Sequence, residues 1–229
     1  MLDALAKRLR QKRFRHGSIN FDTEELHFDI DEKGKPTRCY FKRSKDANKL
    51  IEEFMLLANR TVAESVACPG KGKKPKTLPY RIHDDPDPQK LENLRELTAK
   101  LGYKMKSTST KGATARALNK LMEEVDGHRE AKLVQTIALR SMMKAKYSTH
   151  NIGHFGLAFD YYTHFTSPIR RYPDTMVHRL LTRYQDGGRS ANKSHYEELC
   201  EHCSDMEQIA QNAERDSIKY KMVEFMGEF

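Results

Sequence analysis

The 229-residue sequence contains few cysteines and no long hydrophobic run. Its four cysteines are scattered and lack the spacing of a disulfide framework: Cys39, Cys68, Cys200 and Cys203. No apolar stretch approaches the roughly eighteen residues that a membrane helix needs, and no signal-peptide pattern is present. These absences argue against secreted and membrane-spanning classes. They predict a protein of the reducing cytoplasm with no membrane partner.

Positive charge is in excess. Lysine and arginine number 41 against 32 acidic residues, which gives a net charge of +9 and a pI near 9.3, and the mean hydropathy is -0.81. Such a soluble, basic chain favours a polyanionic partner, because basic surfaces release counterions from a phosphate backbone. Acidic lipid is the alternative, but no basic amphipathic anchor is evident. The length suffices for one sizeable core, or for a domain with an appendage.

Two short motifs offer metal-ligand chemistry, and neither is convincing. Cys200-Glu201-His202-Cys203 would be half of a zinc site, but no second pair with ligand spacing follows. Residues 84–87 carry three carboxylates, yet they stand directly before a predicted helix, where acidic residues usually cap the helix and complement its dipole. We therefore assign no metal ligand in this chain.

Hydrophobic spacing predicts an α+β fold that is mostly helical, with one small antiparallel sheet. The sheet is expected to combine a hairpin over 18–42, a strand over 78–83 and the 150s, the last within an extended stretch over 147–165. Residues 70–76 are predicted to be a flexible basic loop. The first predicted helix covers residues 2–15, with Gly17 as its C-terminal cap. A second is expected to begin at a cap formed by Ser44 or Asp46 and to end at about residue 67. The remaining helices are expected over 89–101, 113–125 and 129–145, from about residue 172 onward, and over 196–226.

The densest polar cluster lies between residues 154 and 179. Pro173 would disrupt a continuous helix, so we expect a first turn over 168–171 and a main helix from Tyr172. This cluster mixes aromatic and hydroxyl side chains with cations and potential cations, and it suits phosphates and stacked bases. A structural corner held by Asp174 explains the same residues equally well. The cations and potential cations are His164, Arg170, Arg171, His178 and Arg179.

Four segments resemble the RNB family of exoribonucleases, the ribonuclease II and ribonuclease R group, with the closer match to the bacterial ribonuclease R type. The first is His154-Phe-Gly-Leu-Ala followed by Tyr-Tyr-Thr-His-Phe-Thr-Ser-Pro-Ile-Arg-Arg-Tyr172. The others are Gly17-Ser-Ile-Asn-Phe-Asp-Thr-Glu-Glu25, Ile51-Glu-Glu-Phe-Met-Leu-Leu-Ala-Asn59 and Gln211-Asn-Ala-Glu-Arg-Asp216. The resemblance covers essentially the whole chain.

The resemblance implies roles for individual residues. Arg170 would stabilise charge on the phosphate, with Glu52 facing the catalytic cleft and Glu214 approaching the arginine. On residue chemistry alone, Glu52, Glu53 and Glu214 would instead be solvated acids. Phe21, which would stack on an RNA base, could equally be a buried strand residue. The expected RNA-binding residues are Phe21, His154, Thr163, Ser167, Arg171, His178 and Arg179.

The resemblance also implies a parent enzyme. That enzyme would be a processive 3′→5′ exoribonuclease using Mg²⁺ to release 5′-mononucleotides from single-stranded RNA. Because the family's aspartate cluster lies upstream of the hairpin, we expect 1–229 to be the C-terminal portion of one catalytic domain. The helix over 196–226 would lead toward an S1 domain.

We expect this chain alone to be inactive and to bind neither Mg²⁺ nor a small-molecule cofactor. An exposed sheet edge would favour self-association. The alternatives are a non-catalytic single-stranded RNA-binding module and a basic scaffold with no RNA role.

Overall fold

The computed structural model describes residues 1–20, 25–106 and 110–227. Helices dominate, and the strands form two separate two-stranded antiparallel sheets, which confirms a mostly helical α+β fold. No helix within these ranges is long and apolar enough to cross a membrane. The elements are α1 (Leu2–Arg15), β1 (Glu25–Ile30), β2 (Pro36–Lys42), α2 (Asp46–Ala67), β3 (Tyr80–Ile82), α3 (Pro88–Lys100), α4 (Lys111–Val125), α5 (Ala131–Ser141), β4 (Lys146–Ser148), the short 3-10 turn Phe155–Leu157, α6 (Tyr172–Gln185) and α7 (Lys193–Met226).

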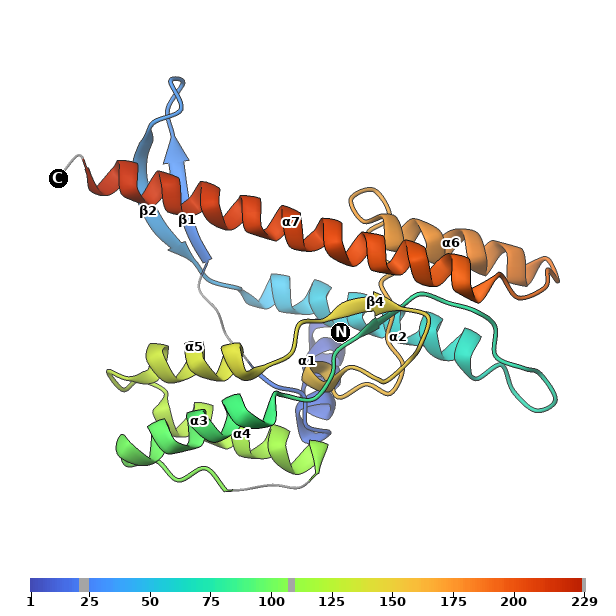
Figure 1. Cartoon of the computed structure of the whole chain (residues 1–229), viewed down its shortest axis with the longest axis horizontal. Helices are drawn as coiled ribbons and strands as arrows, with labels where there is room; N and C mark the ends of the chain where they lie inside the picture. The colour runs from blue at the N-terminus through green and yellow to red at the C-terminus, as the bar shows by residue number, and fades with distance from the viewer. Residues whose placement is uncertain (21–24, 107–109, 228–229) are drawn as a thin grey trace.

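The arrangement of the strands differs from the single predicted sheet. β3 pairs with β4, whereas β1 and β2 form a hairpin of their own, and the 150s contribute only isolated bridges through His154. The hairpin lies across the C-terminal part of α7 (Figure 1), where the rings of Phe28 and Phe225 are 6.1 Å apart. Residues 18–20 are not part of its first strand. Packing against α7 therefore separates the hairpin from β3.

Among the residues that the structure describes, three apolar clusters pack the elements together. One joins α3, α4 and α5, which form the lower left of Figure 1, around Leu94, Leu118 and Val134. A second packs α2 and β3 against α6 through Ala63, Leu78 and Val177, and a third seats α7 on β4. Burial of this apolar surface is the main force that fixes the elements around the candidate site.

Several helix boundaries follow from local capping. Gly17 has a φ of +102° just after the end of α1, which is the left-handed conformation that commonly ends a helix. Asp87 Oδ1 accepts hydrogen bonds from the backbone N–H groups of Gln89 and Lys90, so this acidic residue caps α3 as expected. Asn192 Oδ1 accepts from His195 N at 3.1 Å. This cap starts α7 at residue 193 rather than at 196.

Two further boundaries differ from the predictions. α2 begins at Asp46 with Lys45 at the capping position, where Lys45 N donates to Asn48 Oδ1 at 3.0 Å, so neither Ser44 nor Asp46 is the cap. α5 ends at Ser141 rather than near 145, because Met142 is extended and the following carbonyl of Met143 contacts the imidazole of His83 at 2.8 Å. A tertiary contact therefore ends this helix.

Candidate functional site

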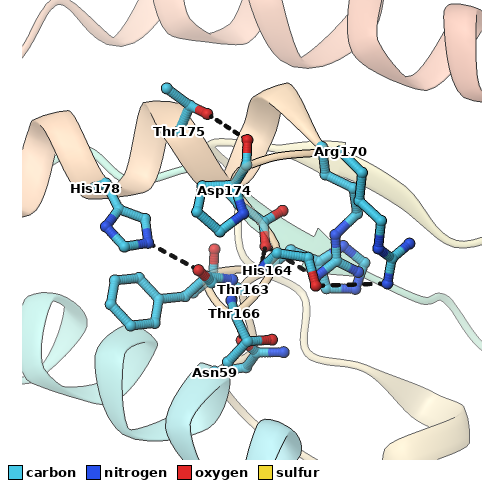
Figure 2. A network of polar contacts seen from close by, with 12 residues as sticks. Asn59, Thr163, His164, Thr166, Arg170, Asp174, Thr175 and His178 are labelled. Carbon is cyan, nitrogen blue, oxygen red and sulfur yellow. Dashed lines mark hydrogen bonds and ion pairs between the residues drawn. The ribbon is translucent and has the colours of Figure 1, made fainter.

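The loop over 165–171 is held from below by one side chain of α2. Asn59, which is 2% exposed, accepts hydrogen bonds through Oδ1 from Phe165 N at 3.0 Å and Thr166 N at 3.2 Å. Its Nδ2 donates to Tyr162 Oη at 3.1 Å. Figure 2 shows Asn59 beneath the loop. The amide thus satisfies two backbone donors that would otherwise be buried without partners.

The loop is held from its other side by the first turn of α6. Asp174 is fully buried, and its Oδ1 accepts from Ser167 N and from Arg171 Nη2, both at 2.8 Å. Thr175 Oγ1 donates to Pro168 O at 3.1 Å. The predicted turn before Tyr172 is present, because residues 168–170 form a turn and α6 begins at Tyr172. Asp174 therefore holds the 165–171 loop against α6, as the interpretation of this cluster as a structural corner predicts.

His178, one turn further along α6, also supports the loop. Its ring stacks on Phe165 with centroids 4.1 Å apart and an interplanar angle of 10°, and its Nε2 lies 2.9 Å from Phe165 O (Figure 2). Arg179 follows on the exposed side of the helix. Of these two predicted RNA-binding residues, His178 packs within the protein and Arg179 faces solvent.

The two adjacent arginines are placed differently. Arg171 is paired with Asp174 and its side chain is only 19% exposed. Arg170 is exposed, and its Nη2 lies 3.5 Å from Ser167 Oγ (Figure 2). Neighbouring Ile169 is also fully exposed. The loop therefore presents the planar guanidinium of Arg170, which can engage two phosphate oxygens at once, while Arg171 stabilises the loop.

A cavity of about 500 Å³ lies between α2 and the loop. Its lining includes Glu52, Asn59, Tyr162 and Arg171, so it brings two predicted site residues to one place. Glu52 also lines a second cavity, of about 460 Å³, together with basic residues of α1. Glu52 therefore lines both cavities, and its place in a catalytic cleft stays a prediction.

Glu53 differs from the expectation that both glutamates are solvated. It is 3% exposed, and Arg13 Nη2 of α1 lies 2.5 Å from its Oε1. Arg13 also approaches Glu52 Oε1 at 3.6 Å. The basic face of α1 is therefore partly buried against α2, since a buried carboxylate requires a compensating charge.

Thr163 is buried and His154 is half-buried. Thr163 Oγ1 donates to Pro79 O at 2.6 Å and is 1% exposed. Burial, together with the neighbouring His83 and Arg81, lowers the pKa of His154 to about 3. Both predicted RNA-binding residues therefore make hydrogen bonds within the protein, His154 by accepting from Leu157 N at 3.2 Å.

His164 is not a cation near neutral pH, contrary to its inclusion among the potential cations. Burial, followed by the charge of Arg171, lowers the pKa of His164 to about 2. Its Nδ1 lies 2.8 Å from Tyr147 Oη. His164 therefore contributes no positive charge to the site near neutral pH.

Two predicted site residues remain, Glu214 and Phe21. Glu214 is exposed on α7, and within the described residues it forms no ion pair with Arg170. Phe21 lies outside the described residues. Across residues 1–20, 25–106 and 110–227, no group of three or more His, Cys, Asp or Glu side chains is arranged to hold a metal ion.

Sequence reasoning missed the role of Asn59. A signal was present, because Asn59 occupies the apolar face of α2 that also carries Leu56, Ala63 and Val66. A polar side chain at such a position needs a buried partner. Its partners are 103 to 107 residues away in sequence, so the spacing alone could not identify them.

Comparison with known proteins identifies the family of this chain. Residues 1–187 match the family described as RNB domain. The chain is 42% identical over 229 residues to ribonuclease R of Aquifex aeolicus, covering 99% of this chain and 32% of the relative. It is 37% identical over 237 residues to ribonuclease R of Escherichia coli, covering 98% of this chain and 28% of the relative.

A solved structure supports the same relationship. The apo form of Mycoplasma genitalium RNase R superimposes with a TM-score of 0.88 at 27% identity, covering 99% of this chain and 36% of the other. The chain thus spans about a third of the length of the relatives it matches. The sequence match and the fold agree, and the chain belongs to the RNB domain family.

Proposed function

We propose that this chain is part of a processive 3′→5′ exoribonuclease that hydrolyses single-stranded RNA to 5′-mononucleotides. The observation that carries the proposal is the 165–171 loop, clamped by Asn59 and Asp174 so that Arg170 projects to solvent, in a member of the RNB domain family. One related structure is of Mycoplasma genitalium RNase R in complex with ribose-methylated single-stranded RNA. That RNA partner supports the same substrate class here.

Arg170 is the proposed phosphate ligand. Its guanidinium remains charged at any physiological pH and would neutralise charge that develops on the phosphate. Arg171 and Ser167 would position the loop, since both bond to Asp174. Glu52 would face the RNA from the cavity beside Arg171. Glu214, which is exposed on α7, would approach Arg170.

Mg²⁺ does not fit the described residues of this chain, because they hold no suitable cluster of ligands. We therefore assign the chain the contacts to RNA and phosphate, and derive no hydrolytic step from it. The parent's aspartates would supply the metal site.

The four free thiols, none in a disulfide among the described residues, suit a reducing cytoplasm.

Binding of a fluorescent single-stranded RNA to the chain, followed by anisotropy across a salt series, tests the RNA-contacting role. Arg170→Ala should weaken binding and reduce the slope of log K against log salt by about 0.7, the value for one phosphate contact on a single strand. Exposed Arg129→Ala, between α4 and α5, is the matched control. Equal effects of the two variants would contradict the assignment of Arg170.

Incubation of the purified chain with 5′-labelled RNA and Mg²⁺ tests the catalytic part. We expect no shortening from the 3′ end. Shortening that disappears in Arg170→Ala would show that the chain hydrolyses RNA by itself. RNA binding by a longer protein that also lacks hydrolysis would instead favour the non-catalytic RNA-binding module.

A further inference from the structure

Two loops at the same end of the molecule bring together cations that the candidate site does not use. The 70–76 loop follows the C-terminal end of α2, and the 186–190 loop follows the C-terminal end of α6 (Figure 1). We call the exposed cations of these loops and their flanks the two-loop surface: Lys71, Lys73, Lys74, Arg183, Arg189 and Lys193.

The two loops are joined by specific contacts. Lys76 Nζ donates to Gly188 O at 2.8 Å and lies 4.7 Å from the centroid of the Tyr184 ring. Thr77 N donates to Ser190 Oγ at 2.9 Å, and Thr77 Oγ1 donates to the backbone carbonyl of Ala191 at 2.9 Å. These contacts bridge more than a hundred residues of sequence and fix the bases of both loops relative to each other.

The glycine pair of the second loop allows it to close over α6. Gly187 has a φ of +80°, and a Cβ on Gly188 would lie 2.6 Å from Arg183 O. Arg183 Nε donates to Arg189 O at 3.1 Å, which directs this side chain along the loop. Only residues without side chains permit this close approach.

Acidic residues are nearly absent from this surface. Residues 65–83 and 187–196 contain no aspartate or glutamate, and Asp186 is the one acid between Gln185 and Glu197. Within the described parts of the chain, no ion pair is found for the exposed side chains of Lys71, Lys73 and Lys74. The positive charge is therefore not neutralised locally, and it would release counterions on contact with a phosphate backbone.

We propose that the two-loop surface is a second contact for the phosphate backbone of RNA, separate from Arg170. α6 has 14 residues and so separates the two regions by about 21 Å. A strand bound at the 165–171 loop could follow the exposed Arg179 along this helix to the two-loop surface. This inference rests on the RNA partner of the proposed function but not on any catalytic step.

Anisotropy with a single-stranded RNA of about twelve nucleotides tests the proposal on the 229-residue chain. The loop variant Lys71→Gln/Lys73→Gln/Lys74→Gln should weaken binding by about tenfold at low salt and reduce the salt slope by about 2, corresponding to three phosphate contacts. The control Lys90→Gln/Lys100→Gln/Lys104→Gln removes the same charge from exposed lysines in and beside α3. It should change affinity less than about twofold.

The outcomes separate this proposal from its rivals. Equal effects of the two triple variants would show that only net charge matters and would overturn it. Sedimentation with phosphatidylserine vesicles tests the lipid alternative. Loss of vesicle binding with unchanged RNA binding in the loop variant would also overturn the proposal. If Arg170→Ala weakens RNA binding and the loop variant does not, this inference fails while the proposed function stands.

Discussion

The carboxylate of Asp174 accepts a hydrogen bond from the backbone N–H of Ser167 at 2.8 Å, across seven residues of sequence. Because Asp174 is fully buried at the start of α6, this contact fixes the loop to a rigid element. The same oxygen pairs with Arg171. The contacts of Asp174 therefore hold Arg171 within the structure and leave the neighbouring Arg170 exposed to a ligand.

Asp174→Ala should lower the free energy of unfolding by about 3 kcal/mol, since it leaves a buried donor and a largely buried guanidinium without their partner. Urea unfolding followed by circular dichroism measures this change. Exposed Asp186→Ala, at the other end of α6, should remain within about 0.5 kcal/mol of the original chain. A loss no larger than that of the control would contradict the clamp.

Asn59→Ala should destabilise the chain by about 2 kcal/mol, because the N–H groups of Phe165 and Thr166 lose their acceptor inside the protein. Tyr162→Phe removes only the hydroxyl that receives the Asn59 donor and should cost about 1 kcal/mol. Urea unfolding of both variants checks the order. Equal losses would show that the loop does not depend on the Asn59 acceptor.

Stability should fall as pH decreases below 6.5. The unfolded chain binds a proton on His164 near its ordinary pKa of 6.5, whereas the folded chain does so only near its lowered pKa of about 2. The unfolded state therefore binds more protons in this window, and stability rises with pH there. In His164→Gln the slope between about pH 4.5 and 5.5 should be smaller by about 1.4 kcal/mol per pH unit. The same substitution at exposed His202 controls for the chemical change, and an unchanged slope in His164→Gln would be the contrary result.

Self-association through the hairpin is a further prediction. Ile30 at the end of β1 is 54% exposed, and a two-stranded sheet leaves edges that can pair with another chain. The mass measured by light scattering should rise with concentration, and Ile30→Lys should reduce this rise. Ile209→Lys, at a similarly exposed position on α7, is the control. A similar reduction in both variants would indicate general apolar contact instead of edge pairing.

Features that depend on neighbouring residues could be predicted from the sequence. The helix of residues 2–15, the Asp87 cap and the turn before Tyr172 are of this kind, because capping and proline chemistry act within one or two turns. The family resemblance also followed from contiguous motifs. The role that we propose for Arg170 rests on its place in such a motif.

The way in which distant residues share the site was set by tertiary packing instead. Packing paired Asn59 with the 165–166 backbone, buried Glu53 against Arg13 and kept His164 neutral. It also placed the hairpin on α7 instead of beside β3. These arrangements depend on partners many residues away in the sequence, and local spacing cannot identify such partners.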